Sequence, residues 1–432
     1  MKETLLHRIK EGLRDMCYIW AKEMRSTITD EGVLIFFILV PILYPLLYSW
    51  AYSSEVVREV PVAVVDLSHS HQSRQFIREF DASPDTKVAY YCTSLDEARQ
   101  LVGKQVVHGV LYFPTDFQTR TLRMEQSHVG VYCDMALMLT YKAIYQTAQA
   151  VASHMNGEVQ IALSGNHTDR EDEILTEPLA FEEVPMFNPT GGYGSFLIPG
   201  VLMLIIQQTL LLGIGLAAGT ARESNRYQDL VPVSRHYNGI FRIVLGKSLA
   251  YFMIYAVISA YLTLVVPRIF GFTSLLSGGS LLALMVPYIL SCIFFGMMLS
   301  CLVRYRENVL LLVVFTTVPF LFLTGMSWPQ SSMPGVWRGI ATLIPSTFGV
   351  RGFVRLNTMG ATLSDIRLEY QALWLQTAVY FLATCAVYRF QIISAHRHAN
   401  DRIQVLKEKA KAARMRKEAQ AKQKVLRPIE QD

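Results

Sequence analysis

Residues 195–220 read SFLIPGVLMLIIQQTLLLGIGLAAGT, and this stretch contains no charged side chain. About 20 apolar residues in helical form are enough to cross the hydrocarbon core of a bilayer. The stretch does not alternate between polar and apolar residues, as a strand of a membrane barrel would. We therefore predict that it forms a membrane-spanning helix, in which the backbone amides are paired internally.

Five further stretches share this character. The chain as a whole is 51% hydrophobic and only 17% charged, a lower charged fraction than that of an ordinary soluble domain. The stretch nearest the N-terminus, residues 33–52, follows a long polar segment. At about 20 residues it is too long for the core of a cleaved signal peptide. We expect a polytopic α-helical membrane protein with six transmembrane helices, at residues 33–52, 195–220, 248–266, 279–303, 308–328 and 370–388.

The distribution of lysine and arginine predicts the orientation. The segments expected on one side of the membrane hold 25 of these residues, whereas the short loops on the other side hold five. The first set comprises residues 1–32, 221–247, 304–307 and 389–432, and the second comprises residues 267–278 and 329–369. Because cytoplasmic loops carry the excess of positive charge, we expect a multi-pass protein of the inner (cytoplasmic) membrane with both termini in the cytoplasm.

Residues 53–192 separate the first two apolar stretches and are predicted to lie outside the cytoplasm. They carry 10 basic and 19 acidic residues. Runs typical of strands alternate with helical patterns, which indicates an α/β extracytoplasmic domain between helices 1 and 2. The predicted strands are 60–67, 87–92, 109–113 and 129–133, the predicted helices are 70–80, 95–102 and 137–163, and a polar loop is expected over 164–173.

Two cysteines of this domain, Cys92 and Cys133, each end a predicted strand. They could pair in an oxidising compartment, and the alternative is two buried thiols.

The two ends of the chain are polar and basic. Residues 1–32 include a helical pattern with one apolar stripe, which predicts an amphipathic helix on the cytoplasmic membrane surface or, alternatively, a helix packed on a partner protein. Residues 389–432 hold 12 basic and five acidic residues and predict a tail that is a solvated helix or partly disordered. Such a tail would lie beside anionic lipids, and nucleic-acid binding is not expected of it.

Several local patterns occur along the chain in a fixed order. They are Lys22-Glu23-Met24-Arg25 with Asp30 and Pro41; Val62-Ala63-Val64-Val65-Asp66-Leu67-Ser68 with Ser73-Arg74; Asn188-Pro189; Phe196-Leu197-Ile198-Pro199-Gly200; and Phe322, Gly325, Pro329, Met333, Pro334 and Pro345. In this order, and over nearly its whole length, the chain resembles the type-2 ABC exporter permeases, in particular the multidrug and related efflux permeases with a large extracytoplasmic domain.

The resemblance implies that the cytoplasmic loop 221–247 couples the permease to an ATPase. The candidate coupling residues are Arg222, Glu223, Asp229, Leu230 and Pro232. A solvated turn that merely follows the positive-inside bias is the alternative. Residues 224–228 lack the Gly-Thr pair of many relatives, which suggests a divergent branch.

On the outer side, prolines interrupt the segment 329–355. Proline removes an amide donor and breaks helices, so short re-entrant helices are predicted here, with an ordinary interfacial loop as the alternative. The resemblance implies that such helices form an outer gate, for which the candidates are Phe322, Gly325, Pro329, Pro334 and Pro345.

No pattern in the chain predicts catalysis or metal binding. The nearest approach to a phosphate-binding loop is Gly246-Lys247-Ser248, but Phe241 stands where that motif needs its first glycine. The pairs His69/His71 and His396/His398 lack further ligands at the usual spacing. We therefore expect no catalytic residue, metal or cofactor in this chain, and ATP and Mg²⁺ on a partner subunit.

The main polar groups at membrane depth are Gln207, Gln208, Thr316 and Thr317. They would either line a substrate pathway or hold the helices together. No Asp, Glu, Lys or Arg lies in the middle of a predicted span, which argues against a carrier coupled to protons or ions.

These observations predict a permease subunit, not itself an enzyme, of an ATP-driven ABC exporter that moves an amphiphilic or lipid-like substrate outward. The expected partners are cytoplasmic ABC ATPase subunits, a second permease copy that is identical or a paralogue, membrane lipids and a periplasmic adaptor. The alternative is a mechanical or signalling membrane protein that is driven by an ATPase and acts through its outer domain without transport. A membrane-embedded enzyme or a receptor is a weaker rival.

Overall fold

The computed structural model describes residues 5–123, 125–165, 168–177, 179, 184, 186–188, 191–225 and 227–426. Pro189, part of one pattern quoted above, lies outside this range. The chain divides into two compact units, one formed by Met1–Ser53 with Tyr193–Asp432 and the other by Ser54–Gly192. We call the first the helical unit and the second the α/β unit.

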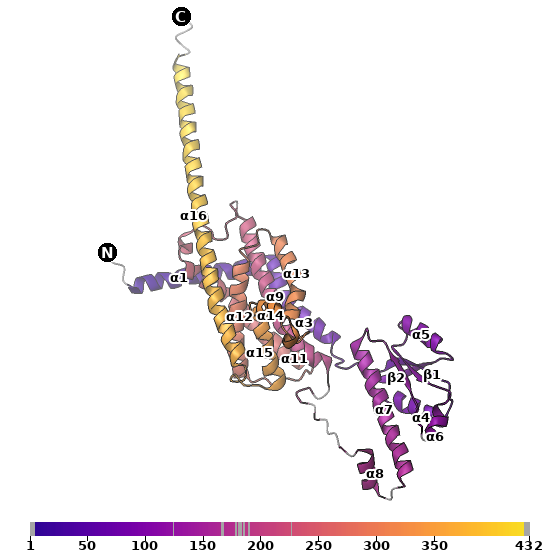
Figure 1. Ribbon diagram of the computed structural model, residues 1–432. Coiled ribbons are helices and arrows are strands. Elements are labelled where there is room, and N and C mark those ends of the chain that lie inside the picture. The colour runs from indigo at the N-terminus through magenta and orange to yellow at the C-terminus, as the bar shows by residue number, and fades with distance from the viewer. Residues whose placement is uncertain are drawn as a thin grey trace. The chain divides into compact units, whose positions relative to one another are not determined.

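Among the residues described, the regular secondary structure of the helical unit is entirely helical (Figure 1). Its α-helices are α1 (Leu5–Thr29), α2 (Glu31–Leu34), α3 (Val40–Ala51), α9 (Tyr193–Glu223), α10 (Ile240–Ala260), α11 (Val266–Ile269), α12 (Gly278–Leu299), α13 (Arg306–Leu323), α14 (Gly335–Ala341), α15 (Pro345–Met359) and α16 (Arg367–Leu426). π-Helical turns at Ile35–Leu39 and Tyr261–Val265 join α2 to α3 and α10 to α11, and 3₁₀ turns lie at Arg235–Tyr237 and Gln330–Ser332.

Among the described residues, six helices are long and apolar enough to cross a membrane, and each contains all or most of one stretch predicted above. They are Glu31–Ala51, Tyr193–Glu223, Ile240–Ile269, Gly278–Leu299, Arg306–Leu323 and Arg367–Met415. The fifth helix ends at Leu323, five positions before the predicted end at Trp328, because Gly325 turns the chain at a φ of 86°. A left-handed φ costs little only at glycine, so this residue ends the helix.

Helix α9 is the centre of the helical unit. Its most apolar window is 89% buried, compared with 17% for α13. Helices α3, α12, α13 and α15 all pack against it. The stretch 195–220 lacks charge because α9 is surrounded by protein on every side, and each large apolar side chain fully buried there contributes about 1.5–3 kcal/mol.

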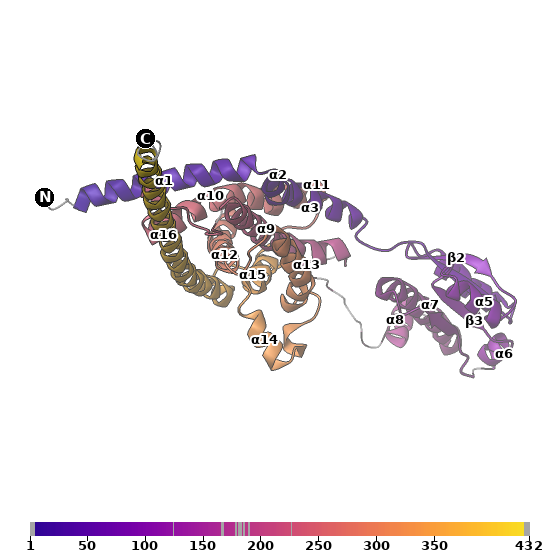
Figure 2. The same ribbon diagram turned by 90° about the horizontal axis from the view of Figure 1, so that it is seen from above.

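The helical unit has two distinct ends. We call the end that holds Asp30, Glu223 and Arg306 the Asp30 end, and the end that holds Tyr52, Tyr193 and Gly325 the Tyr52 end. Helix α1 lies across the Asp30 end and packs against α10 (Figures 1 and 2). Helix α16 passes through the bundle and continues beyond the Asp30 end as one unbroken helix (Figure 1). The helical alternative for the tail is therefore confirmed up to Leu426.

Helices α14 and α15 form a hairpin that enters the bundle from the Tyr52 end. The backbone N–H of Ser346, in the first turn of α15, donates to Oε1 of Gln207, which lies near the middle of α9. At its other end α15 is bonded back to the α11–α12 loop, where Leu275 N donates to Asn357 O at 2.8 Å. The predicted short helices of segment 329–355 are thus present, and α15 starts at half the depth of the bundle.

The α/β unit contains one sheet and five helices among its described residues. The strands are β1 (Val60–Asp66), β2 (Thr86–Tyr91), β3 (Gly109–Phe113) and β4 (Gly130–Cys133), and the helices are α4 (His71–Asp81), α5 (Leu95–Gly103), α6 (Phe117–Leu122), α7 (Met138–Ser164) and α8 (Asp169–Thr176). The strand order is β2-β1-β3-β4, in which β1 is parallel to β2 and β3 and β4 is antiparallel to β3. This confirms the predicted strands and main helices to within about two residues.

The two faces of the sheet bury different side chains of β1. Val62 and Val64 point to the face covered by α4 and α7, and Ala63 and Val65 point to the face covered by α5. Period-two alternation of the side chains places them so, and burial on both faces explains why β1 is a continuous apolar run. The polar loop predicted over 164–173 is partly wrong, because Thr168 accepts from Glu171 N and begins helix α8.

Candidate functional site

A cluster around Asp30 joins three helices at the Asp30 end. Asp30 begins α2, and its Oδ1 accepts from the Gly32 and Val33 N–H groups and from Arg306 Nη2 at 2.7 Å. Its Oδ2 accepts from the Thr220 hydroxyl, near the end of α9, at 2.8 Å. Burial opposes ionisation of this carboxyl, but the hydrogen bonds from Thr220 and Val33 and the Arg306 charge outweigh it, so the pKa of Asp30 lies below its usual value.

Arg222 is buried at the end of α9 rather than exposed to a partner. Its guanidinium donates to the carbonyl oxygens of Ser300 at 3.1 Å, Cys301 at 3.2 Å and Val303. These carbonyls follow the last turn of α12, where the chain leaves unpaired acceptors and a partial negative charge. The side chain therefore ties α9 to α12.

The neighbouring Glu223 is exposed, and one of its carboxylate oxygens accepts from Arg306 N at the start of α13 at 3.0 Å. It stabilises the first turn of that helix, as a capping side chain does. Two adjacent residues of the predicted coupling loop therefore hold different helices.

Asp229 and Leu230 are also buried, and they attach the loop to α16. Asp229 Oδ2 lies 2.9 Å from His398 Nδ1, and Leu230 N donates to Gln391 Oε1 at 3.4 Å. Pro232 is half-buried. The side chains of the predicted loop that face outward are instead such residues as Val233, which is 56% exposed, and Arg235, which is 78% exposed.

Two buried carboxylates attach α1 to the same end. Asp15 Oδ2 accepts from Arg242 Nη1 at 2.6 Å, and its Oδ1 lies 2.6 Å from His236 Nδ1. Burial of Asp15 opposes its ionisation, but the bonds and charges of His236 and Arg242 outweigh this effect and hold the pKa of Asp15 below its usual value.

The second carboxylate is Glu23, which lies 2.9 Å from Lys247 Nζ and also accepts from the Tyr251 hydroxyl. Lys247, which in sequence belongs to the incomplete phosphate-loop pattern, is thus a partner in a buried ion pair. Side chains on the opposite face of α1, such as Ile9 and Leu13, remain about half exposed.

The four polar residues predicted at membrane depth lie in one layer of the helical unit. Since α9 and α13 are antiparallel, with Gly219 against Arg306 and Gly215 against Val309, equal steps along both helices place Gln208 and Thr316 at the same depth. The hydroxyls of Thr316 and Thr317 donate to carbonyls of their own helix.

The glutamines of this layer are buried inside one copy of the chain. Gln207 holds the first turn of α15, and neither amide atom of Gln208 has a hydrogen-bond partner within the described ranges. Both roles considered from the sequence, a pathway lining and a packing contact, therefore stay predictions for Gln208, whereas Gln207 makes a packing contact in this structure.

The predicted gate residues begin the short helices at the Tyr52 end. Pro329 precedes the 3₁₀ turn, Pro334 precedes α14, and Pro345 is the first residue of α15, positions at which a missing N–H costs nothing. Phe322 and Pro334 line an apolar cavity of about 310 Å³ together with Trp328 and Trp337.

The chain is similar to known proteins over most of its length. Residues 32–386 match the family described as ABC-2 family transporter protein. The chain belongs to this family. It is also 25% identical over 399 residues to the inner membrane transport permease YhhJ of Escherichia coli (strain K12) and to the protein of the same name from Shigella flexneri, and the match covers 88% of this chain and 97% of each relative. The family match makes the protein an ABC-2 transporter permease, and its long apolar helices fit a membrane protein.

Sequence reasoning missed the residues that hold the Asp30 end of this ABC-2 permease together. Asp15, His236, Arg242 and Arg306 were not singled out from the sequence. A signal was present, since buried carboxylates are rarely unpaired and acidic residues on the apolar side of an amphipathic helix need basic partners. The partners themselves are separated by up to 276 residues in the sequence.

In the α/β unit of the ABC-2 permease, Cys92 and Cys133 do not form the disulfide considered from the sequence. Both thiols are free. Cys92 follows β2 and packs on the face with Ala63, whereas Cys133 ends β4 and packs on the face with Val62. Strands β2 and β4 are opposite edges of the sheet, so the two cysteines lie at different edges and on different faces. A disulfide between them is therefore incompatible with this fold, and that alternative is wrong. Burial raises the pKa of both thiols.

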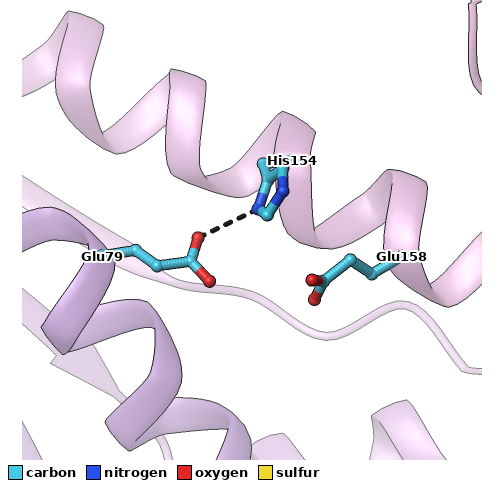
Figure 3. Close-up of side chains that lie close together, drawn as sticks. All are labelled: Glu79, His154 and Glu158. Atoms are coloured by element: carbon cyan, nitrogen blue, oxygen red, sulfur yellow. Dashed lines mark hydrogen bonds and ion pairs between the residues drawn. The ribbon is translucent and has the colours of Figure 1, made fainter.

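The same unit brings together three side chains that could hold a divalent metal ion. Figure 3 shows Glu79 of α4 facing His154 and Glu158 of α7, with Glu79 Oε2 3.1 Å from His154 Nδ1. All three ligand atoms lie within 4.8 Å of one another. The amide of Gln75 donates to both carboxylates, at 3.0 and 2.8 Å, so the cluster is also satisfied as a polar contact between the two helices. The spacing His154-x₃-Glu158 was its only sequence signal.

Proposed function

We propose that this permease is the membrane subunit of an ATP-driven exporter that moves an amphiphilic or lipid-like substrate outward across the inner membrane. Two permease copies form the pathway, and two cytoplasmic ATPase subunits, which carry ATP and Mg²⁺, bind at the Asp30 end. Both termini lie in the cytoplasm, and the α/β unit lies outside, where a periplasmic adaptor would contact it.

The observation that carries the proposal is the set of polar ties at the Asp30 end. Arg222 connects α9 to α12, Asp30 connects α2 to α9 and α13, and Asp15 and Glu23 connect α1 to α10. A force on the loop between α9 and α10 would therefore move several helices together. This is what an ATPase-coupled permease needs, because the stroke has to reach the membrane helices without being absorbed by a mobile loop.

The proposal assigns two roles within the loop. The buried residues Arg222, Asp229 and Leu230 transmit the movement, while the exposed residues Val233 and Arg235 contact the ATPase. An exposed apolar residue beside a cation suits a shallow cleft in a partner. The Val233 side chain would be buried in the cleft, and Arg235 would contact an acidic group of the partner.

A second permease copy would cover α13. Its side chains Val314 and Phe315 are 66% and 75% exposed, and only 17% of its most apolar window is buried within one copy. α13 also carries Thr316 and Thr317, so pairing of two copies along it would place these residues beside the pathway. The partner copy is an identical chain or a paralogue.

The substrate class follows from a groove between α10, α12 and α16. This cavity of about 570 Å³ is lined almost entirely by apolar side chains, among them Phe252, Phe294, Trp374 and Phe381. An acyl chain or a similar apolar body could occupy such a groove with little polar desolvation. This favours a substrate that enters from the bilayer.

The test is to copurify the full-length permease with candidate ATPases encoded beside it and to measure ATP hydrolysis. The combined Val233→Asp and Arg235→Glu variant should lower hydrolysis by about tenfold, a loss of about 1.4 kcal/mol of contact energy. The matched control is Arg338→Glu, an exposed charge reversal on α14 at the opposite end. Failure of every neighbouring ATPase to bind would remove the energy source and refute the proposal.

A second measurement separates export from its alternative. Inside-out vesicles that contain the complex should accumulate a fluorescent short-chain lipid on addition of ATP. Hydrolysis that depends on Val233 and Arg235 without movement of any amphiphile tested would favour an ATPase-driven mechanical protein that acts through the α/β unit.

A further inference from the structure

A cavity of the α/β unit gathers basic side chains at the carboxyl ends of its parallel strands. It measures about 830 Å³, and its lining includes Asp66, the last residue of β1, and Cys92, the first residue after β2. α4 connects these two strands (Figure 1) and carries three basic residues of the lining, His71, Arg74 and Arg78. The cavity lies at the same end of the sheet as the switch point between β1 and β3, outside the carboxyl ends of the strands, where open α/β sheets bind ligands.

Four nitrogen-bearing side chains converge on this cavity, namely His69, His71, Arg74 and Arg78. They do so in a unit whose segment 53–192 holds 10 basic and 19 acidic residues, so the concentration of positive charge is local. Arg74 Nη2 donates to His69 O at 2.8 Å, and the guanidinium of Arg78 has no partner among the residues described. Guanidinium groups bind phosphate and carboxylate groups through two parallel hydrogen bonds.

The one carboxylate in the lining is already engaged. Asp66 Oδ1 accepts from the N–H groups of Ser68 and His69, each at 3.0 Å, and Oδ2 accepts from the Ser73 hydroxyl at 2.8 Å. These bonds fix a tight turn in which His69 has a φ of 49°, a left-handed conformation that is unfavourable for a residue with a side chain. The turn is held in this conformation by Asp66, and it carries the two histidines at the edge of the cavity.

Apart from Thr93, the rest of the lining is apolar or aromatic. Val64 and Ile77 form part of it, and the ring of Tyr91 is 71% exposed. The cavity therefore offers a cationic side for an anionic group and an apolar side for a carbon body.

We propose that this cavity binds a phosphate ester, with the phosphate group held by Arg74, Arg78, His69 and His71 and the carbon body against Tyr91. Two guanidiniums and two imidazoles suit a dianionic phosphate better than a single carboxylate. The ligand would be either the headgroup of a phospholipid or a soluble phosphate monoester. The inference concerns binding by the α/β unit alone and does not depend on export or on ATPase coupling.

The test is calorimetric titration of the full-length permease in phosphatidylcholine nanodiscs with glycerol 3-phosphate and with a short-chain phosphatidate. Saturable binding of at least one probe is expected. The double variant Arg74→Gln, Arg78→Gln should weaken it by about tenfold or more. The matched control is Arg99→Gln on α5, whose exposed guanidinium lies outside the cavity and is 3.9 Å from Asp96. Because all three arginines are exposed, unchanged circular dichroism and thermal midpoints should accompany these results.

The two probes distinguish the sources of the ligand. Equal affinities would assign a soluble phosphate monoester, and binding of the phosphatidate alone would assign a lipid headgroup whose body packs on Tyr91. The proposal is overturned if neither probe binds saturably to the natural sequence, or if the double variant binds as tightly as the Arg99→Gln control.

Discussion

Substituting alanine for Arg222 removes the side chain that donates to three carbonyls after α12. Its bonds to Ser300 O and Val303 O are buried, whereas the bond to Cys301 O is partly exposed. Each buried carbonyl left without a donor costs about 1–3 kcal/mol, so the two buried ones together cost about 2–6 kcal/mol. The third carbonyl can bond to water and adds little.

The matched comparison is Glu223→Ala, one position further along the chain. Glu223 is exposed, and its side chain accepts a hydrogen bond from Arg306 N, so its loss resembles the loss of a helix cap and costs about 1 kcal/mol. The thermal midpoint of the purified permease in detergent, followed by tryptophan fluorescence, should therefore fall far more for Arg222→Ala. At roughly 2–4 °C per kcal/mol, a 4 kcal/mol loss corresponds to a fall of about 8–16 °C.

A third variant, Arg222→Lys, refines the comparison. Lysine keeps the charge but lacks the planar fork, so it can reach some of the carbonyls but not all three, and an intermediate midpoint is expected. If Arg222→Ala and Glu223→Ala shift the midpoint by the same small amount, the buried ties do not stabilise the Asp30 end, and Arg222 would have to be reconsidered as a contact for the ATPase.

Three further outcomes follow from the structure. A Cβ on Gly349 would lie 2.2 Å from the buried Tyr288 ring, so Gly349→Ala should cost about 1–3 kcal/mol by overpacking, and an unchanged thermal midpoint would contradict the close α12–α15 contact. Because the pKa of Asp15 is lowered in the folded state, its pairing stabilises the fold above the ordinary value of 3.8 and is lost as the pH falls through the folded-state pKa. The difference in midpoint between the natural sequence and Asp15→Asn should thus be present at pH 5 and shrink below pH 4, and a difference that grows towards acid would show the opposite sign. Finally, oxidation should leave Cys92 and Cys133 unlinked within one chain, as judged by mass spectrometry of peptides, and a Cys92–Cys133 peptide would disprove the strand order.

The membrane helices and the α/β unit were predictable from local sequence. A charge-free run such as 195–220 determines a buried helix by its composition alone, and the alternation of short apolar runs with helical patterns in 60–133 determines the order of strands and helices. The prolines at 329, 334 and 345 likewise mark the starts of short elements, because the missing N–H of proline leaves no acceptor unpaired at the start of a helix.

The candidate site was predictable only in outline. The loop after α9 was identified, but the sequence does not reveal that Arg222 and Asp229 point into the protein, since their partners Val303 and His398 lie 81 and 169 residues away. A basic or acidic residue in a cytoplasmic loop has the same composition signal whether it faces solvent or a helix end. Only the packing of distant helices decides between these two environments.

The unbroken course of α16 gives the permease a lever. This helix belongs to the bundle over its first part and then continues as a single rod to Leu426, with side chains exposed from Asn400 to Met415. At 1.5 Å per residue the part beyond Arg389 is roughly 55 Å long, so a tilt of about 10° where the helix leaves the bundle would move its far end by roughly 10 Å. Small rearrangements among the membrane helices are thereby converted into displacements that a label near residue 415 could report.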